Sequence, residues 1–448
     1  MPEFKILEED LSKLNHKNLG SVIEFSNETW NQKDFFENEF PYIEISEIDT
    51  TSGGIQNITY YKKSKAPSRA KMIVRENDII VSTTRPHRGA ITLIDKDDDG
   101  FIASTGFAIL REPKIKINRE YLLSFLRTQL SLKQMLRRSS GGNYPAITSE
   151  ELKKIIVPLP PLQTQNCIVE LMDNAYKIKK QKETDAQQLL DTIDNYVLDE
   201  LGIKLPELKD EMCYVIWGDD VKNNRCDAYY YQPKFTLAES KLEAVDYPVF
   251  SIGELITDLS GGATPKVEGD FYTDIDGVFF LRVQNISMEG IILEDVKFIK
   301  REVHEGMLKR SQLNKNDLVY TITGRIGSVV VVPEGFEGNI NQHSVRFHLK
   351  EKINNININP HYVAIFLNTE LSNFLAIRKA TGGTRPALDY PALKSLTIPL
   401  PSKEIQDKIT KEVKARMQKA EQLQKEAKEV LEEAKERVEK VILGEEEI

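Results

Sequence analysis

The sequence predicts an α+β protein: two similar α/β domains and two long helices that pair as an antiparallel coiled coil, with an internal pseudo-two-fold repeat. Two observations lead to this fold class. Residues 141–160 and 382–401 share a Gly-Gly loop, a Pro-Ala pair and a closing Pro-Leu-Pro, and the register of 241 holds without a gap as far as Ile168 and Ile409. Each copy then runs into a segment with one apolar stripe at helical spacing.

The two stripes predict long helices over residues 163–201 and 402–443. The first segment contains neither Gly nor Pro, and Gly202 follows it as a C-cap. Its stripe consists of Ile168, Leu171, Ala175, Ile178, Ala186, Leu189, Ile193 and Val197, with a slip near Lys182. Forty helical residues reach about 60 Å, and a helix with one apolar stripe needs a partner. The chain must reverse between the two segments, so we expect them to pair in antiparallel fashion.

Changes in composition divide the chain into four parts. Residues 1–160 form a first α/β domain and residues 161–203 a central helical region. Residues 204–401 comprise a connector and a second α/β domain, and residues 402–448 form the C-terminal helical region. At 448 residues, each globular part is long enough to bury its own core.

Within the domains, short β-rich runs alternate with turns. Residues 78–82 and 317–322 are typical of buried strands, and the polar–apolar alternation within 281–286 predicts another strand. Residues 120–138 carry an apolar face that predicts a single helix, and 362–377 match them in the second copy.

The charge distribution indicates local rather than global basicity. The net charge of −9 argues against a nucleic-acid binder, but residues 60–88 hold eight Lys and Arg against two acids. Residues 127–138 hold four and no acid, whereas the acidic surplus lies in places such as 97–99 and 445–447. Basic patches on an acidic chain fit a protein that contacts DNA in places and other proteins elsewhere.

Several functional classes lack their signatures. No apolar run approaches the ~18 residues of a membrane span, and the N-terminus shows no signal region. The three cysteines form no CxxC, which favours a reducing, cytoplasmic location. There is no phosphate-binding GxxxxGK[ST] loop, and the six histidines lack metal-ligand spacing. We therefore expect no catalytic residues, metal or cofactor on this chain.

The candidate binding residues are polar and basic side chains on loops. Hairpins at 77–89 and 316–327 carry arginine near their tips, and arginine can bind guanine or phosphate through two hydrogen bonds. The Gly-Gly loops can bring backbone N–H groups to a phosphate. The candidates in the first domain are Lys62, Lys63, Thr83, Arg85, His87, Arg88, Asn143 and Tyr144, and those in the second are Thr264, Lys266, Arg282, Gln284, Asn285, Thr323, Arg325, His343, Thr384 and Arg385. A solvated turn or the wet face of a strand explains the same patterns.

Together these motifs resemble the specificity subunit of type I restriction-modification systems over nearly the whole chain. The resemblance rests on the order of weak motifs rather than on any one of them. They are Gly-Gly-Ala-Thr-Pro-Lys at 261–266, the 281–286 segment, the 316–327 hairpin, Asn-Ile-Asn-Gln-His at 339–343, Pro-Leu-Pro at 158–160 and 399–401, Gln165 and Gln406, and the segment 225–233.

The resemblance implies two target-recognition domains, each reading one half of a bipartite, asymmetric site on double-stranded DNA. The helices then act as a spacer and dock two methyltransferase subunits, which carry S-adenosylmethionine and methylate adenine N6. Restriction subunits add ATP- and Mg-dependent translocation and cleavage. The first copy lacks the Gly-Gly-Ala-Thr-Pro-Lys opening and has Thr-Arg-Pro-His-Arg-Gly at 84–89 in place of Gly-Arg-Ile-Gly at 324–327, which predicts different half-sites.

Two other functions remain open at this stage. One is an enzyme, a methyltransferase or nuclease fused to a recognition domain, in which Asn359-Pro360-His361-Tyr362 resembles the Asn-Pro-Pro-Tyr of amino-methyltransferases. Asn359 is better explained as an N-cap and Pro360 as the first residue of the following helix. The other is a non-catalytic coiled-coil scaffold with protein-binding α/β domains, which the acidic composition favours and the arginine-bearing hairpins oppose.

Overall fold

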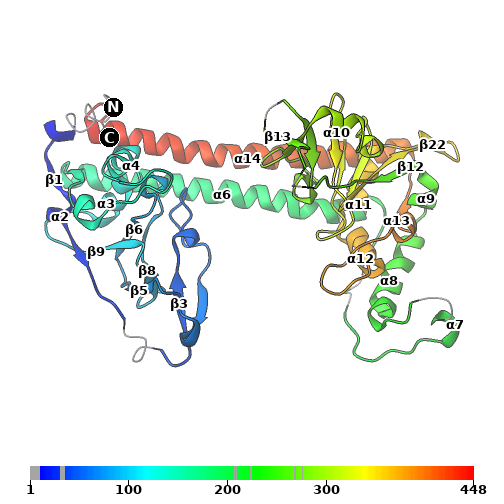
Figure 1. Ribbon diagram of the computed structural model, residues 1–448, viewed down its shortest axis with the longest axis horizontal. Helices are drawn as coiled ribbons and strands as arrows, with labels where there is room; N and C mark the ends of the chain where they lie inside the picture. The colour runs from blue at the N-terminus through cyan, green and yellow to red at the C-terminus, as the bar shows by residue number, and fades with distance from the viewer. Residues whose placement is uncertain are drawn as a thin grey trace. The chain divides into compact units, whose positions relative to one another are not determined.

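The computed structural model describes residues 11–30, 36–205, 207, 209–221, 225–266, 269–274 and 276–447. The chain forms two compact units, unit 1 from residues 1–184 and 423–448 and unit 2 from residues 185–422. The long helices α6 (Leu162–Glu200) and α14 (Lys403–Leu443) each contribute one part to each unit (Figure 1). Helices are therefore present where both apolar stripes predict them.

Unit 1 contains two four-stranded sheets. The first is antiparallel with the order β2 (Ile23–Ser26), β9 (Phe107–Pro113), β6 (Ile79–Ser82) and β7 (Ile91–Leu93). The second has the order β4 (Thr59–Lys62), β3 (Glu39–Ile43), β8 (Ile102–Ser104) and β5 (Ala70–Ile73), with β3 and β8 parallel. A short ribbon of β1 (His16–Asn18) and β10 (Ile156–Pro158), followed by α2 (Leu19–Val22), leads into the first sheet.

Unit 2 repeats this plan. Its antiparallel sheet has the order β12 (Ile256–Gly261), β21 (Ser344–Leu349), β18 (Leu318–Thr321) and β19 (Val329–Val331). The second sheet has the order β13 (Tyr272–Thr273), β17 (Lys297–Ile299), β14 (Val278–Leu281) and β20 (Gly338–Ile340), again with one parallel pair, β14 and β20. The ribbon of β11 (Val249–Ser251) and β24 (Thr397–Pro399) corresponds to β1 and β10.

The same buried hydrogen bonds recur 241 residues apart. The Tyr121 hydroxyl donates to the Pro158 carbonyl at 2.8 Å, and the Tyr362 hydroxyl donates to the Pro399 carbonyl. Gln165 accepts from the Asn118 amide and donates to Pro160, and Gln406 does the same with Asn359 and Pro401. These bonds tie each long helix to the domain that precedes it and confirm the internal repeat.

The prediction of one helix over 120–138, and of its match over 362–377, was wrong. Each region forms two helices, α3 (Arg119–Leu126) and α4 (Gln129–Arg137) in unit 1, and α11 (Pro360–Asn368) and α12 (Glu370–Lys379) in unit 2. The break falls at Thr128 and Thr369, whose hydroxyls donate to carbonyls three residues earlier at 2.7 Å. Threonine competes for backbone bonds in this way, and its extended backbone starts a new helix.

The start of each second helix is capped by an acid from a long helix. In unit 1, Glu439 of α14 accepts from the Gln129 amide and from the Leu130 amide, the latter at 3.3 Å. In unit 2, Asp194 of α6 accepts from the Glu370 amide at 2.6 Å. Burial raises the pKa of both carboxyls, while their hydrogen bonds to the backbone act in the opposite direction. A negative charge at a helix N-terminus interacts favourably with the helix dipole. These contacts therefore attach the domains to the long helices.

Within each unit, α6 and α14 run antiparallel. Lys182 pairs with Glu426 at 2.5 Å in unit 1, and Lys408 pairs with Glu200 at 2.7 Å in unit 2. The Arg416 guanidinium donates to the Thr192 carbonyl at 3.2 Å. For each residue further along α6, the paired residue of α14 has a number lower by one. All three pairs obey this relation, so both units use the same register.

Most of the predicted stripe of α6 is buried, but Leu171 and Leu189 are only half-buried and Ile178 is exposed. Ile168, Ala175, Ala186, Ile193 and Val197 are buried, whereas Ile178 is 47% exposed. The neighbouring Lys179 is turned inward instead, and its ammonium bonds Glu183 at 2.7 Å. The slip therefore comes about one helical turn before Lys182. A lysine stem covers apolar surface while its charged end stays paired, so the position need not be apolar.

Candidate nucleic-acid interface

In unit 1, three loops meet at one end of the antiparallel sheet. They are the turn after β6 (residues 83–89), the loop before β9 (residues 104–106) and the Gly-Gly loop (residues 139–147). The Thr83 amide donates to the Gly106 carbonyl at 2.8 Å, and the Ile147 amide donates to the Thr83 carbonyl at 2.9 Å. Backbone bonds therefore fix the turn from both sides, and the predicted Thr83 side chain adds to them because its hydroxyl donates to the Gly106 carbonyl at 2.8 Å.

Arg85 lies at the centre of this loop cluster. Its backbone is left-handed, with φ of 49°, and its amide donates to the Pro145 carbonyl at 2.7 Å. The guanidinium carbon lies 4.1 Å from the centroid of the Tyr144 ring, a cation–π contact, and Tyr144 is 70% exposed. The structure thus brings together three predicted residues, because the guanidinium also donates to the Asn143 carbonyl at 3.4 Å.

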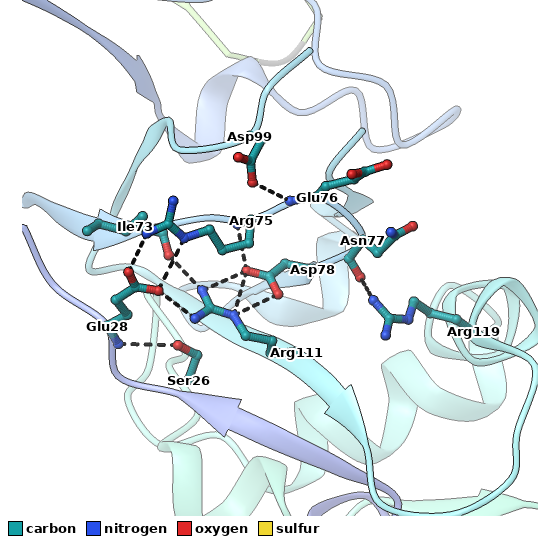
Figure 2. A network of polar contacts seen from close by, with 10 residues as sticks. All are labelled: Ser26, Glu28, Ile73, Arg75, Glu76, Asn77, Asp78, Asp99, Arg111 and Arg119. Carbon is teal, nitrogen blue, oxygen red and sulfur yellow. Dashed lines mark hydrogen bonds and ion pairs between the residues drawn. The ribbon is translucent and has the colours of Figure 1, made fainter. Parts of the chain in front are cut away.

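A network of charges anchors the other end of the same strand (Figure 2). Asp78 is fully buried at the start of β6, and Arg111 of β9 donates to it through Nε and Nη2, each at 3.0 Å. Arg111 and Arg75 both pair with Glu28, and the hydrogen bond from Arg75 is the main cause that lowers the pKa of that carboxyl. The turn at Asn77 has φ of 68°, a left-handed conformation that Asn tolerates. The hairpin that presents Arg85 therefore rises from a rigid base.

In unit 2, the equivalent loops meet in the same way. The Ile322 amide donates to the His343 carbonyl and the Leu388 amide to the Ile322 carbonyl, both at 2.9 Å. Thr323 forms an isolated bridge with Ala387, as Thr84 does with Ala146. The Thr384 and Arg385 side chains are exposed on the Gly-Gly loop.

A fourth loop, residues 261–266, joins this end of unit 2. The Gly262 amide donates to the Ser344 carbonyl at 3.2 Å, and a Cβ at Gly262 would lie 2.1 Å from the Ile340 carbonyl oxygen. Only glycine allows so close an approach. Thr264 then reaches the Gln342 side chain, whose nitrogen lies 3.0 Å from His343 Nε2. The exposed Thr264 and Gln342 and the half-buried His343 thus form one polar group near Thr323.

Two predicted residues of unit 2 are occupied with internal bonds. Asn285 is fully buried; its side chain accepts from the Arg282 amide at 3.0 Å and donates to the Ile292 carbonyl at 2.9 Å. Arg325 donates to Ser328 Oγ at 2.7 Å and to the Ile286 carbonyl at 2.8 Å. Asn285 therefore shapes a turn, and Arg325 holds the hairpin against it.

The expected strand over 281–286 was wrong between its two end residues, because only Leu281 and Ile286 belong to strands, β14 and β15 (Ile286–Ser287). β14 ends at Leu281, and Val283–Asn285 form a 3-10 turn, η5, because the Asn285 side chain captures the Arg282 amide. Arg282 donates to the Asp295 carbonyl, and Gln284 is exposed. Arg282 and Gln284 consequently do not share the face of a strand.

Of the remaining candidates, Lys62 and Lys63 lie outside these loops, whereas His87, Arg88 and Lys266 lie within them. Lys62 lies on β4 in the other sheet, and Lys63 follows in a 3-10 turn. Arg88 is exposed two residues after the buried Pro86. His87 is half-buried in the same turn, and Lys266 is exposed beyond Thr264. Among the described residues, Lys62 and Lys63 form no hydrogen bond or ion pair with the Arg85 group.

Sequence reasoning missed Gln342, Tyr390 and Arg69. A Cβ at Gly261 would lie 1.8 Å from the Tyr390 hydroxyl, which places this 41% exposed tyrosine beside the 261–266 loop. The Arg69 carbonyl accepts from the Thr105 amide at 2.8 Å, next to the loop that holds Thr83. Gln342 lies inside a motif, and Arg69 inside the basic stretch 60–88, that the sequence already singled out, whereas Tyr390 had no signal because long-range pairing brings it there.

The two domains place their arginines on different loops of the same frame. Arg85 and Gly324 occupy corresponding left-handed positions, with φ of 49° and 79°, while Tyr144 and Arg385 occupy corresponding positions on the Gly-Gly loops. Of these two corresponding positions, arginine thus occupies the one on the turn in unit 1 and the one on the Gly-Gly loop in unit 2. Similar frames with different side chains suit two different targets.

Comparison with known proteins places this architecture among DNA specificity proteins. A family model, the type I restriction modification DNA specificity domain, matches twice, over residues 12–189 and 244–433. The chain is 29% identical over 156 residues to the EcoBI specificity subunit of Escherichia coli, a match that covers 35% of this chain and 32% of that protein. It is 24% identical over 383 residues to the MjaVIII specificity subunit of Methanocaldococcus jannaschii, covering 83% and 80% of the two chains.

A solved structure titled as the structural basis of complex assembly and conformational transition of the type I R-M system shares the fold. It aligns with a TM-score of 0.55 at 20% identity and covers 96% of both chains. The chain belongs to the family of type I restriction-modification specificity subunits, as the resemblance implied. The match to the EcoBI subunit spans about a third of that protein's length.

Two further observations concern only the part of the chain that the structure describes. No helix there has the length and apolarity needed to cross a membrane. No group of three or more His, Cys, Asp or Glu side chains there is arranged to hold a metal ion.

Proposed function

We propose that this chain is the DNA-recognition subunit of a type I restriction-modification complex and that each domain reads one half of a bipartite, asymmetric site. The observation that carries this proposal is the repeated loop cluster. Both units fix three corresponding loops by backbone hydrogen bonds and expose different polar side chains on them. Backbone anchoring with variable side chains is what a pair of readers with different targets requires.

The exposed side chains have the chemistry to read base edges. Arg85 and Arg385 can donate two hydrogen bonds to guanine, and Gln342 can pair with adenine in the same manner. Thr264, Thr384 and Asn143 add short polar contacts to bases or phosphates. Tyr144, stacked on Arg85, restricts that guanidinium and reduces the entropy lost on binding.

We further propose that α6 and α14 separate the two halves and dock two methyltransferase subunits. A helix of 39 residues extends about 58 Å, more than the ~34 Å of one DNA turn, which leaves unread base pairs between the halves. Both helices also carry exposed polar residues on the sides opposite their buried stripes. Partner subunits would carry S-adenosylmethionine, ATP and Mg, and a restriction and translocase subunit would cleave the DNA. This chain itself would contribute recognition and no catalysis, and the complex would act in the cytoplasm.

The first test is to express the chain with the methyltransferase subunit of the same genomic locus and to map adenine methylation by single-molecule sequencing. The expected result is a split motif with N6-methyladenine in both halves. Exchange of residues 1–160 for those of a relative should alter only one half. Absence of methylation, together with absence of DNA binding by the reconstituted complex at low salt, would overturn the proposal and favour a protein-binding scaffold.

Salt titration provides an independent readout. Phosphate contacts release counterions, so the logarithm of the binding constant should fall linearly with the logarithm of salt, by about 0.9 per phosphate neutralised. A DNA affinity that does not change with salt would contradict recognition through Lys and Arg.

A further inference from the structure

The connector before the second domain contacts the helix from which a predicted recognition loop emerges. The segment 225–231 follows α7 (Gly218–Val221) and ends in a 3-10 turn, η4 (Ala228–Tyr231), before α8 (Pro233–Glu243). In unit 2 it lies against the C-terminus of α12, and the Gly-Gly loop with Thr384 and Arg385 begins two residues after that helix.

Arg225 binds the end of α12 directly. Its Nη1 donates to the carbonyls of Arg378 at 3.3 Å, Lys379 at 3.1 Å and Ala380 at 2.9 Å. The last carbonyls of a helix have no donor within the helix. A cation placed beside them also interacts favourably with the helix dipole. Asp227 orients the guanidinium by accepting from its Nε at 2.7 Å.

The Tyr230 ring lies between this arginine and one from the helix itself. Its centroid is 5.0 Å from the Arg225 guanidinium and 4.5 Å from that of Arg378. The buried Arg378 also donates to the Tyr230 carbonyl at 2.8 Å and pairs with Glu239 of α8. The connector, α8 and α12 are therefore held together by charges and a ring stacked between two cations.

The clamped helix end fixes where the loop starts. Immediately after Ala380, Thr381 and Ala387 exchange two backbone bonds of 2.8 Å, and Leu388 donates to Ile322 at 2.9 Å. Between these bonds, the Gly-Gly loop projects with its side chains exposed. A shift of the α12 terminus would move the root of this loop, and with it Arg385.

The corresponding helix end in unit 1 is closed by different means. After α4, the Ser139 hydroxyl donates to the Met135 carbonyl at 2.8 Å, and Arg138 pairs with Glu151 at 3.4 Å. The unit 1 loop thus provides an internal reference for any change made in the connector.

We propose that Arg225 is a positioning residue for DNA recognition: it fixes the root of the 381–388 loop, so the accuracy with which unit 2 reads its half-site depends on the connector. This inference rests on the proposed function, but it concerns a segment outside the loops that would touch DNA. Replacement of Arg225 should relax one half of the recognised motif and leave the other half unchanged.

Hydrogen exchange of the full chain tests the structural part without DNA. In Arg225→Met, the amides of Thr381, Ala387 and Leu388 should exchange about tenfold faster, equivalent to about 1.4 kcal/mol. The corresponding amides Ser140, Ala146 and Ile147 of unit 1 should not change. Arg310→Met, which alters an exposed arginine on η6 (Lys309–Ser311) elsewhere in unit 2, is the matched control and should leave all of these rates unchanged.

Methylation mapping of the complex tests the functional part. Relative to the wild type, Arg225→Met should raise methylation at sites with one mismatch in one half by about tenfold, with sites mismatched in the other half unaffected. Arg225→Lys keeps the charge but loses the Nε–H that Asp227 orients, so an intermediate effect is expected. Unchanged exchange and an unchanged motif would overturn the inference, as would equal relaxation of both halves. If the wild-type complex methylates no split motif, the proposed function fails, while the exchange rates still decide whether the clamp exists.

Discussion

Arg111 in unit 1 offers a sharp test of how the base of the recognition hairpin is held. Asp78 is fully buried, and Arg111 supplies three hydrogen bonds to its carboxylate, with the Arg75 amide adding one at 2.8 Å. Arg111→Met would leave a buried carboxylate without its counter-charge. Removal of one partner from such a pair costs roughly 3–5 kcal/mol.

The double variant separates the cost of the lone charge from the value of the pair. Asp78→Asn/Arg111→Met removes both charges, so it should recover a large part of the loss and remain about 1–2 kcal/mol below the wild type, the cost of the hydrogen bonds that are not replaced. Arg111→Met alone should be the least stable of the set.

Hydrogen exchange is the appropriate assay because a two-unit chain need not unfold in one step. A loss of 3 kcal/mol corresponds to roughly hundredfold faster exchange for amides that exchange by opening of the unit. The amides of β6 and β9 report on unit 1, and those of β18 and β21 in unit 2 serve as the reference. If Arg111→Met accelerates β6 and β9 less than tenfold, or if the double variant is no better than the single one, the buried pair does not hold the hairpin.

The remaining predictions concern one helix cap and four loop positions. Burial raises the pKa of Asp194 above its ordinary value of 3.8, so the folded state holds this proton more tightly and the contribution to stability falls as pH rises through the raised pKa. The unfolding free energy of the wild type minus that of Asp194→Asn should therefore decrease from about pH 4 upward and then level off; a difference that grows with pH would contradict the assignment. Gly324→Ala places a Cβ in open space at a φ of 79° and should cost roughly 1–2 kcal/mol, whereas Gly327→Ala also meets Asn373 Oδ1 at 1.6 Å and should cost more in thermal unfolding. Arg85→Met and Arg385→Met should each alter a different half of the methylation motif, and an identical change from both would refute separate reading.

Much of the architecture could be predicted because it depends on local and periodic signals. The long helices follow from runs without Gly or Pro that carry a stripe, and the repeat follows from matched Gly-Gly and Pro-Leu-Pro segments. Asn359 caps α11 as the sequence indicated, with its side chain accepting from the His361 amide at 3.0 Å. Where the prediction was wrong, a side-chain bond to the backbone decided the outcome, as at Thr128, Thr369 and Asn285.

The loop clusters were harder to predict from the sequence. Gln342 meets Thr264 across 78 residues, and Tyr390 meets Gly261 across a still longer separation. Such groups depend on strand order, which one sequence does not reveal. From the sequence, Arg325 and Asn285 were also expected to contact bases. In the structure, both side chains hydrogen-bond to nearby backbone carbonyls instead.

Of the two corresponding loop positions, arginine occupies the one on the turn in one domain and the one on the Gly-Gly loop in the other. This difference bears on how new specificities arise by recombination. A crossover that carried only the second Gly-Gly loop into the first domain would set a second arginine beside Arg85. The reciprocal product would have Gly324 on its turn and Tyr144 on its loop, and so no arginine at either of these two positions. Recombinants that keep each turn with its own Gly-Gly loop avoid both defects. We therefore expect productive exchanges between relatives to have their junctions outside residues 83–147 and 322–388, in the ribbons or in the long helices.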